Sequence, residues 1–317
     1  MAQQNYVIEA KNLQKAYGKN VVLRGIDIAV ERGTMLALLG PNGAGKTTTV
    51  RILSTLLGFD SGTVTIEGHD VKTDADAVRR VIGLTGQSAA VDELLTGREN
   101  LIMMGRLYRL TKASAKARAQ ELLEEFDLVD AADRPLKTYS GGMRRRLDLA
   151  VSLIATPPII FLDEPTTGLD PRSRIAMWNI INTLKQKGAT ILLTTQYLEE
   201  ADQLADRIVV IDGGKVIAEG TARELKSKVG NDRLELAFKD EATLEKAKNI
   251  LSGHADADNE ALTLTMMIQD TNVDVRSALD ALAAAGVSVD SMAVHKPTLD
   301  DVFLSLTGKQ VTEKEEK

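Results

Sequence analysis

The segment GPNGAGKT at residues 40–47 constrains the fold more than any other part of this sequence. It follows a short apolar run at 35–39 and precedes a helix-like stretch at 48–57, which is the context that the phosphate-binding pattern G-x-x-x-x-G-K-[ST] requires. The loop amides of such a motif surround a β-phosphate, its lysine neutralises β- and γ-oxygens, and its hydroxyl ligates Mg²⁺. A plain glycine-rich turn before a helix is the alternative interpretation. The residues expected to contact a nucleotide are Gly40, Pro41, Asn42, Gly43, Ala44, Gly45, Lys46, Thr47 and Thr48.

A second apolar run, IIFLDEP at 159–165, ends in two carboxylates. A continuous apolar run of this length predicts a buried parallel strand, and ligands of open α/β sheets lie beyond the carboxyl ends of the strands. Asp163 then suits the task of holding Mg²⁺ through water, with Thr47 as the other protein ligand, and Glu164 suits that of polarising an attacking water. The alternative is a capping acid followed by a helix-starting proline.

The segment YSGGMRRRLDLA at 139–150 offers a second anion cradle. Ser140, Gly141 and Gly142 place a hydroxyl and unobstructed backbone amides ahead of an apolar-periodic segment, so free N–H groups and the positive end of a helix dipole point the same way. Two such cradles suggest a nucleotide held between two surfaces, which a P-loop kinase or GTPase does not explain. For most of the charge in the run 144–146 we prefer a solvated helix face.

In their order along the chain, these motifs resemble those of ATP-binding cassette (ABC) ATPase subunits. The matching segments are GPNGAGKT, Gln87, YSGGM, IIFLDE and TTGLD at 166–170, and the resemblance covers roughly the first 228 residues. It implies ATP and Mg²⁺, and a head-to-tail dimer, either a homodimer or one with a second cassette, in which the serine–glycine segment of one subunit binds the γ-phosphate on the other. It also implies that Gln87 contacts Mg²⁺ and water, that Asp170 lies in a loop crossing the dimer interface, and that Tyr17 stacks on adenine. Packing at a strand edge is the alternative for Tyr17.

Three positions depart from the family pattern. Met143 stands where glutamine is usual, and Tyr139 stands where leucine is more usual; neither change removes the phosphate contacts expected of the cradle. Gln196, directly after the apolar run 190–195, replaces the usual histidine. Glutamine can donate to a phosphate and accept from water, but it cannot be protonated. We expect Gln196 to keep the positioning role in catalysis beside Glu164; the competing interpretation is a slowed or inactive site.

The predicted fold class is α/β: a P-loop NTPase cassette with a parallel sheet core, an antiparallel β subdomain and a helical subdomain at about 88–139, followed by a small α+β module. The cassette is expected over 1–228, the accessory domain over 229–308, and a charged, disordered tail over 309–317. The elements expected in the accessory domain are strands at 234–238, 262–268 and 287–293 and helices at 242–251, 273–285 and 297–306.

Two further segments narrow the resemblance. TGRENLIMMGRLYRL at 96–110 and PTLDDVFLSLTG at 297–308 are similar to those of daunorubicin-resistance-type exporter ATPases, which work with a separate polytopic membrane subunit. In that family the helical insert docks the membrane subunit, and apolar residues such as Met103 and Met104 can serve either that surface or the core. The resemblance implies export of drugs or other small amphipathic compounds; no motif identifies the cargo.

Composition limits the remaining functions. The net charge of −6 argues against nucleic-acid binding, and the absence of cysteine excludes disulfides and thiolate zinc sites. We expect no signal peptide, no membrane-spanning segment, and a peripheral location on the cytoplasmic face of the membrane. The alternative function is a soluble ABC-type ATPase acting on nucleic acid or ribosomes. A long heptad insertion, tandem cassettes or a basic face would favour it, and the sequence has none of them.

Overall fold

The computed structural model describes residues 6–86, 91–228, 232–251, 255–268 and 271–306. The chain divides into two compact units, Met1–Ala222 and Arg223–Lys317. The predicted boundary at residue 228 falls after helix α8 (Ala222–Ser227), most of which belongs to the second unit. Gln87 and the predicted tail at 309–317 lie outside the described residues.

A six-stranded sheet, in the order β10-β9-β3-β8-β7-β6, forms the centre of the first unit. Strands β3, β7 and β8 are buried along their whole length, because both faces of a parallel sheet are covered. Neighbouring strands from β9 to β6 run parallel, whereas β10 pairs antiparallel with β9. The strands are β3 (Met35–Leu39), β6 (Ile82–Thr85), β7 (Ile159–Asp163), β8 (Thr190–Thr195), β9 (Arg207–Asp212) and β10 (Lys215–Gly220).

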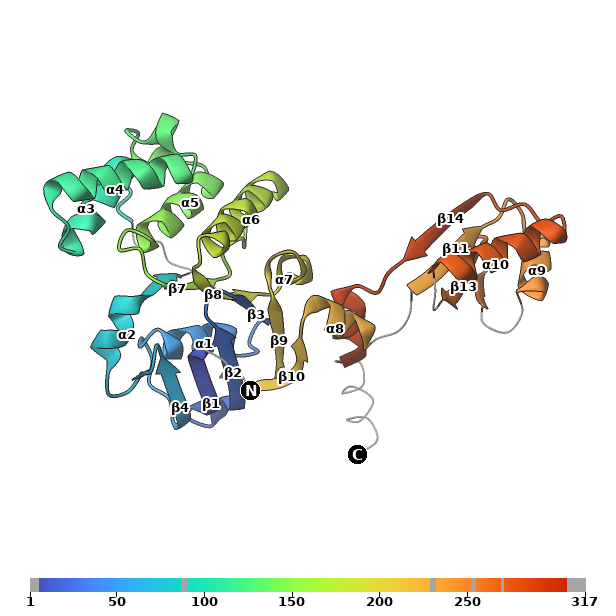
Figure 1. Cartoon of the computed structure of the whole chain (residues 1–317), viewed down its shortest axis with the longest axis horizontal. Helices are drawn as coiled ribbons and strands as arrows, with labels where there is room; N and C mark the ends of the chain where they lie inside the picture. Colours follow the sequence, from blue (N-terminus) through green and yellow to red (C-terminus); the bar gives the residue numbers. More distant parts are fainter. Residues whose placement is uncertain (1–5, 87–90, 229–231, 252–254, 269–270, 307–317) are drawn as a thin grey trace. The chain divides into compact units, whose positions relative to one another are not determined.

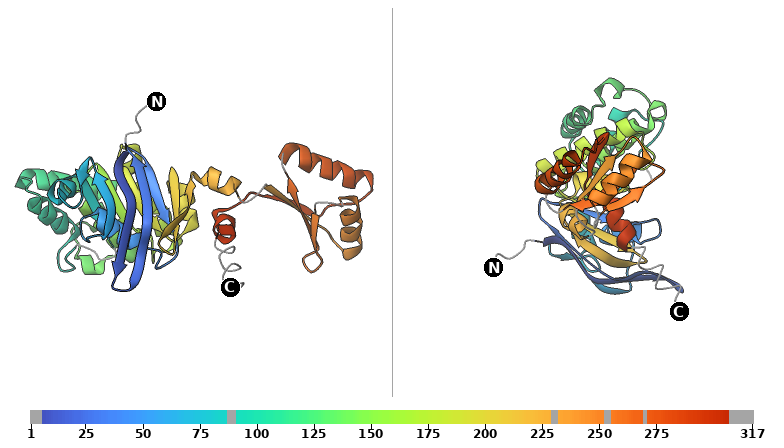
Figure 2. Two further views of the ribbon diagram at one scale, coloured as in Figure 1. Left: turned by 90° about the horizontal axis from the view of Figure 1, so that it is seen from below. Right: turned by 90° about the vertical axis from the view of Figure 1, so that its right-hand side faces the viewer.

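A second sheet, antiparallel and in the order β2-β1-β4-β5, completes the β structure of this unit. Figure 2 shows its long first two strands side by side in blue, next to the β9–β10 hairpin. The hairpin joins the second sheet where Arg24 N donates to Gly214 O at 2.8 Å. The strands are β1 (Tyr6–Tyr17), β2 (Asn20–Glu31), β4 (Ser61–Ile66) and β5 (His69–Asp70).

The helices of the first unit lie on both sides of the central sheet. Helices α3 to α6 gather on one side of β7 and β8, and α1 lies on the other side with β1 and β4 (Figure 1). Helices α3 and α4 lie within the range 88–139 where the sequence predicts a helical subdomain. The helices are α1 (Lys46–Leu53), α2 (Ala75–Val81), α3 (Gly97–Leu107), α4 (Lys112–Glu125), α5 (Gly141–Ser152), α6 (Pro171–Gln186) and α7 (Leu198–Leu204), with 3₁₀ turns at Val129–Ala131 and Leu136–Thr138.

Two separate hydrophobic cores cover the two faces of the sheet. Ile160 and Leu162 of β7 pack into the core of the helical side, which includes Phe126 of the α4 terminus. Ile159 and Phe161 of the same strand pack into the opposite core with α1 and the antiparallel sheet. Alternate side chains of β7 thus pack into the two cores on opposite faces of the sheet.

The second unit is an antiparallel sheet, β12-β13-β11-β14, covered by two helices. Leu234 and Leu264 on the sheet pack with Leu244 and Leu282 on the helices, and all four are fully or almost fully buried. The elements are β11 (Asp232–Ala237), α9 (Glu241–Ile250), β12 (Ala255–Asp258), β13 (Thr263–Ile268), α10 (Thr271–Ala284) and β14 (Ser291–His295), followed by a helix at 299–306.

The last strand of this unit begins later than predicted, at Ser291 rather than at 287. Val287 closes the preceding helix, because its amide donates to Leu282 O at 2.9 Å and its side chain packs into the core. Gly286, with φ +68°, provides the left-handed residue that such a helix end favours. In the part of the chain that the structure describes, no helix is long and apolar enough to cross a membrane.

Candidate functional site

Three adjacent parallel strands end at one edge of the central sheet, and each is followed by a residue predicted to serve the site. In the register, Leu39 of β3 pairs with Thr195 of β8, and Asp163 of β7 pairs with Thr194 of β8. Gly40 follows β3, Glu164 follows β7 and Gln196 follows β8, so the sheet itself brings the three segments together. A hydrogen bond from Gly40 N to Thr195 O, 3.3 Å long, continues the ladder into the glycine loop.

The glycine loop between β3 and α1 has the shape of a phosphate cradle. Gly45 has φ +108°, and a Cβ there would lie 2.5 Å from Leu23 Cδ2, so this position admits only glycine. At Gly40 a Cβ would lie 2.2 Å from Ile211 O. No side chain caps α1 at Gly45, and the amides of its first turn have no acceptor within the helix. The loop therefore presents free N–H groups to an anion.

Lys46 lies across this cradle with only 4 % of its side chain exposed. Its ammonium donates to Gly40 O at 2.7 Å and to Pro41 O at 3.1 Å, and it lies 3.4 Å from Glu164 Oε1. A buried ammonium needs such compensation. The same three donors can turn to phosphate oxygens without moving the backbone.

Oxygen atoms suited to Mg²⁺ converge beside the lysine. Thr47 Oγ1 lies 3.2 Å from Asp163 Oδ1, which also accepts from Thr194 Oγ1 at 2.6 Å. A hydroxyl and a carboxylate are ligands that Mg²⁺ takes together with water and substrate phosphate. Among the described residues no group of three or more His, Cys, Asp or Glu is placed to hold a metal. The Thr47 hydroxyl and the Asp163 carboxylate fit Mg²⁺, which usually keeps several of its waters.

Glu164 stands at the end of β7 in an unusual backbone conformation, with φ +51°. Its amide donates to Thr194 O and to Thr194 Oγ1, both at 3.1 Å. Its carboxylate reaches Lys46 through one oxygen, and the other lies 3.4 Å from the Thr167 hydroxyl. The carboxylate therefore faces the phosphate cradle, as expected for a group that orients water.

Two further residues of the predicted site, Gln196 and Tyr17, lie at the ends of strands. Gln196 is half-buried directly after β8, so it shares the edge with Glu164. Tyr17 ends β1 with 49 % of its surface exposed, and the Lys15 ammonium lies 5.5 Å from its ring centroid. An exposed ring of this kind is available for stacking.

The second cradle begins α5, as predicted, with Ser140 as the N-cap. Ser140 Oγ accepts from Met143 N at 3.2 Å, and Gly141 is exposed with open space around its Cα. Gly142 is tightly packed, because a Cβ there would lie 2.6 Å from Ser173 Oγ. Among the described residues no hydrogen bond or ion pair joins the second cradle to the glycine loop of β3 and α1.

Asp170 caps the next helix, α6. Its carboxylate accepts from Ser173 N at 3.0 Å and from Ser173 Oγ at 2.6 Å, and these bonds lower the pKa of Asp170. The bonds fix the loop 166–170, which leads from the glutamate to this helix.

The expected solvated face at 144–146 is wrong for two of the three arginines, because their guanidinium groups bind backbone carbonyls. Only 15 % of the Arg145 side chain and 18 % of the Arg146 side chain are exposed. Arg146 donates to Phe126 O and Asp127 O, whereas Arg145 reaches the loop after β7. Burial lowers the pKa of Arg145, and the carboxylates of Asp148 and Asp163 oppose that shift. Only Arg144, paired with Glu93 at 2.7 Å, fits the prediction.

Glu200 is a further residue that sequence reasoning missed. It is fully buried in α7, where its Oε1 accepts from Thr166 Oγ1 at 2.7 Å and from Trp178 Nε1 at 3.1 Å. Burial raises the pKa of this carboxyl, against the effect of its hydrogen bonds. Glu200 links the loop after Glu164 to the helix after Gln196. The sequence signal that could have pointed to Glu200 is its position four residues after Gln196, in the helix that follows β8.

Family models match a large part of each of the two units. The model described as ABC transporter matches residues 23–167, and the one described as ATP-binding protein DrrA1-3-like, C-terminal domain, matches residues 220–307. The chain is 52 % identical to the daunorubicin/doxorubicin resistance ATP-binding protein DrrA of Streptomyces peucetius, over 95 % of this chain and 92 % of that protein. It is 51 % identical to the daunorubicin resistance ATP-binding protein DrrA3 of Streptomyces coeruleorubidus, over 95 % and 96 %.

Solved structures resemble the first unit. The structure of an ATP-binding subunit of an ABC transporter matches with a TM-score of 0.63 and 32 % identity, covering 70 % of this chain and 92 % of that one. A dimeric post-hydrolysis cassette, MJ0796 bound to ADP and Pi, matches with a TM-score of 0.61 and 28 % identity, covering 68 % and 98 %. The chain therefore belongs to the ATP-hydrolysing subunits of ABC transporters, within the daunorubicin-resistance type.

Proposed function

We propose that this subunit energises the export of drugs or similar small amphipathic compounds, with ATP bound between two cassettes and a separate polytopic permease as membrane partner. The observation that carries the proposal is the convergence of Lys46, Thr47, Asp163 and Glu164 at the carboxyl edge of the sheet, with Lys46 Nζ 3.4 Å from Glu164 Oε1. The resistance proteins named among its relatives support the cargo class. The chain is expected at the cytoplasmic face of the membrane, as a peripheral subunit.

In the proposed reaction, the glycine loop and Lys46 hold the phosphates of ATP, and Thr47 and Asp163 hold Mg²⁺, with Gln87 as a further contact. Mg²⁺, when bound, would neutralise charge that develops on the phosphate oxygens. Glu164 accepts a proton from water as the water attacks the γ-phosphorus and the bond to ADP breaks. Gln196 helps to orient that water, and Tyr17 stacks on the adenine.

The second cradle completes the site from another subunit. Because no hydrogen bond or ion pair among the described residues joins Ser140–Gly142 to the glycine loop of its own chain, and Gly141 is exposed, the segment can meet the γ-phosphate of a facing copy. Asp170 then lies at the interface between the two copies. Closing of the dimer would be transmitted to the permease through the helical subdomain.

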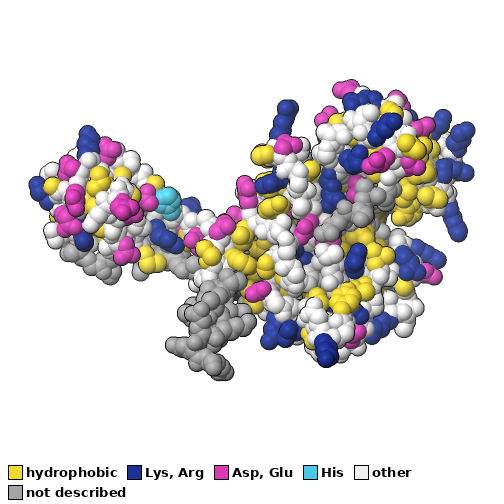
Figure 3. Space-filling view, turned by 180° about the vertical axis from the view of Figure 1, so that it is seen from behind, with side chains coloured by type: hydrophobic (Ala, Val, Ile, Leu, Met, Phe, Trp, Pro, Cys, Tyr) yellow, Lys and Arg dark blue, Asp and Glu magenta, His cyan; other side chains and the backbone are white. Residues whose placement is uncertain are grey.

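Exposed apolar side chains on that subdomain offer a surface for the permease. Leu94 and Leu107 are 77 % and 69 % exposed, whereas Met104 packs against the helical core. Of the two roles considered for Met104, docking surface or core, its packing favours the core. On the face shown in Figure 3, Lys and Arg side chains are interspersed with Asp and Glu, which does not favour a nucleic-acid partner.

Glu164→Gln tests the proposal. The amide keeps the shape of the side chain but accepts a proton poorly, so the variant should bind ATP, stop hydrolysis and accumulate as a closed dimer. Light scattering after size exclusion should give the dimer mass in Mg-ATP and the monomer mass in ADP. A monomer in Mg-ATP, or hydrolysis at the parent rate, would contradict the mechanism. Failure to copurify with any polytopic membrane protein from the native host would contradict the transport role.

A further inference from the structure

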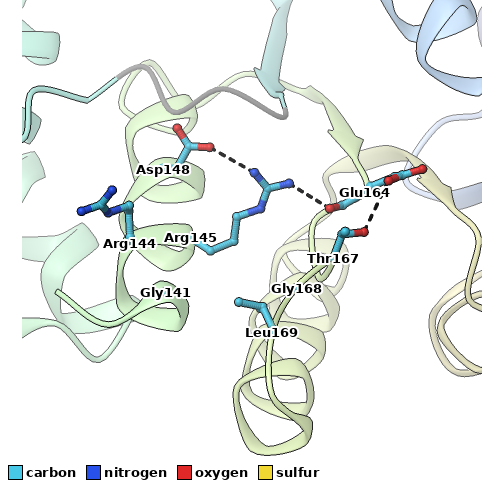
Figure 4. A pocket seen from close by; sticks show the side chains of 8 residues that line it. All are labelled: Gly141, Arg144, Arg145, Asp148, Glu164, Thr167, Gly168 and Leu169. Carbon is cyan, nitrogen blue, oxygen red and sulfur yellow. Dashed lines mark hydrogen bonds and ion pairs between the residues drawn. The ribbon is translucent and has the colours of Figure 1, made fainter.

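Arg145 of α5 reaches across the molecule to the backbone that carries Glu164. Its Nε donates to Pro165 O at 2.9 Å, and its Nη2 donates to Asp163 O at 3.1 Å and to Glu164 O at 3.0 Å. Figure 4 shows the side chain spanning a cavity of about 410 Å³ from α5 toward Glu164, whereas Arg144 points away. One guanidinium therefore holds three consecutive carbonyls around the proposed general base.

The same guanidinium has two further contacts. Nη1 donates to Gly86 O at 2.7 Å and lies 3.7 Å from Asp148 Oδ2. Gly86 directly precedes Gln87 in the chain, so Arg145 binds the starts of two segments expected to contact water and Mg²⁺. A lysine could not reproduce this arrangement, because an ammonium lacks the planar fork that serves several acceptors at once.

The backbone at Glu164 needs such support. A residue with a Cβ at φ +51° is strained, and strain of this kind persists only where the surroundings over-determine it. Thr194 holds the amide of Glu164 from the β8 side, and Arg145 holds its carbonyl from the α5 side. Between these two restraints, the carboxylate is aimed at Lys46.

We propose that Arg145 is a positioning residue for ATP hydrolysis: it fixes the backbone of Glu164 so that the carboxylate faces the phosphate cradle, and it makes that geometry depend on the position of α5. The proposal rests on the proposed role of Glu164. Because α5 begins with Ser140–Gly142, a phosphate bound there by a facing subunit would act on Glu164 through the helix and this one side chain.

Arg145→Ala should separate positioning from binding. In the full-length protein, kcat for ATP should fall about 10- to 100-fold, the loss that misplacing a reacting group by about 1 Å produces, while KM changes less than about threefold. Arg146→Ala is the matched control, since Arg146 is the next residue of α5, is similarly buried and also binds backbone carbonyls. It should lower the melting temperature as much as Arg145→Ala does, yet leave kcat within about threefold of the parent.

Chemical rescue provides a readout that a merely structural arginine would not give. Guanidinium at tens of millimolar should raise kcat of Arg145→Ala at least fivefold by entering the vacated part of the cavity, and should not raise kcat of the parent or of Arg146→Ala. Arg145→Lys should stay close to Arg145→Ala. Parent-like kcat in Arg145→Ala, or loss of kcat that guanidinium does not reverse, would overturn the proposal.

Glu164→Gln measured alongside distinguishes the two possible failures. Parent-like hydrolysis in Glu164→Gln would show that Glu164 is not the general base, and the positioning role of Arg145 would fall with that assignment. An inactive Glu164→Gln together with a fully active Arg145→Ala would leave the proposed function standing and refute only the positioning role.

Discussion

The two predicted phosphate cradles of this chain differ in how many of their contacts come from the chain itself. The glycine loop at 40–47 is packed against neighbouring strands, and its lysine is almost completely buried among partners from the same chain. In the segment Ser140–Gly142, the serine hydroxyl accepts from its own helix, with no other partner among the described residues, and the first glycine is open to solvent. We call the first the complete cradle, because its described partners come from one subunit. The second is the incomplete cradle, because the proposed function places a phosphate from another subunit against it.

The largest expected effect belongs to the complete cradle. Lys46→Ala removes the buried ammonium and should reduce hydrolysis about 100- to 1,000-fold, as the loss of a preorganised charge donor does in other active sites. Steady-state phosphate release and binding of a fluorescent ATP analogue would measure it. Lys72→Ala is the control, because Lys72 is exposed and lies over the Phe59 ring, away from the loop. A Lys46→Ala protein with a third of parental activity would contradict the assignment.

The second prediction concerns the incomplete cradle. Gly141→Asp places a carboxylate where open space exists, so the fold should tolerate it, and a negative charge at a helix start is favourable. Hydrolysis should nevertheless fall about 10- to 100-fold, because the carboxylate repels the phosphate expected there. ATP affinity of the monomer should change less than about threefold.

Gly142→Ala is the informative companion to that variant. Its added Cβ would meet Ser173 Oγ at 2.6 Å, so it should lower stability by about 1–3 kcal/mol, whereas Gly141→Asp should not. Thermal unfolding compares the two. If Gly141→Asp hydrolysed ATP normally, the second cradle would have no part in the reaction.

A smaller effect is expected at Gln196. Removing its amide in Gln196→Ala should lower kcat about 10-fold through poorer alignment of water, with KM unchanged. Gln196→His should retain activity, since imidazole can also donate and accept. A parental kcat in Gln196→Ala would show that Gln196 does not orient the attacking water. The melting temperatures of both variants should equal that of the parent, so that a loss of folding does not account for a lower rate.

The smallest effect concerns Glu200, which is buried beside the loop that follows Glu164. Because the pKa of Glu200 is raised in the folded protein, its proton stabilises the fold below the ordinary carboxyl pKa, and that stabilisation is lost as pH rises through the folded value. Glu200→Gln removes this titration. The melting temperature of the variant, relative to the parent, should therefore increase from pH 4.5 to pH 8 by roughly 2–4 °C, on the order of 1 kcal/mol in a domain of this size. A constant difference across that range would mean that Glu200 is ionised in the fold.

The sequence predicted where the residues of the complete cradle lie, because they stand in contiguous motifs. The glycine loop, Asp163 and Glu164 each follow an apolar run long enough to fix a buried strand, and the sheet then brings them together without further information. Ser140 was identified as a helix start for the same local reason.

Residues whose role depends on distant backbone could not be predicted in this way. The burial of Arg145 is stabilised by carbonyls at residue 86 and at 163–165, and nothing local distinguishes it from its more exposed neighbour Arg144. Strand β12, with the sequence ADAD, contains no β-branched or aromatic residue and forms through pairing with β13. In both cases tertiary contacts outweigh local preference.

The uniform burial of β7 affects how this strand finds its register against β8. A strand that is apolar on both faces gains no register from hydrophobic alternation, since a slip by one residue would bury equally apolar side chains. Its alignment against β8 is instead marked at the two ends, where Pro158 O accepts from Thr190 N and Asp163 Oδ1 accepts from Thr194 Oγ1. The carboxylate proposed to hold Mg²⁺ therefore also helps to set the register of β7 against β8.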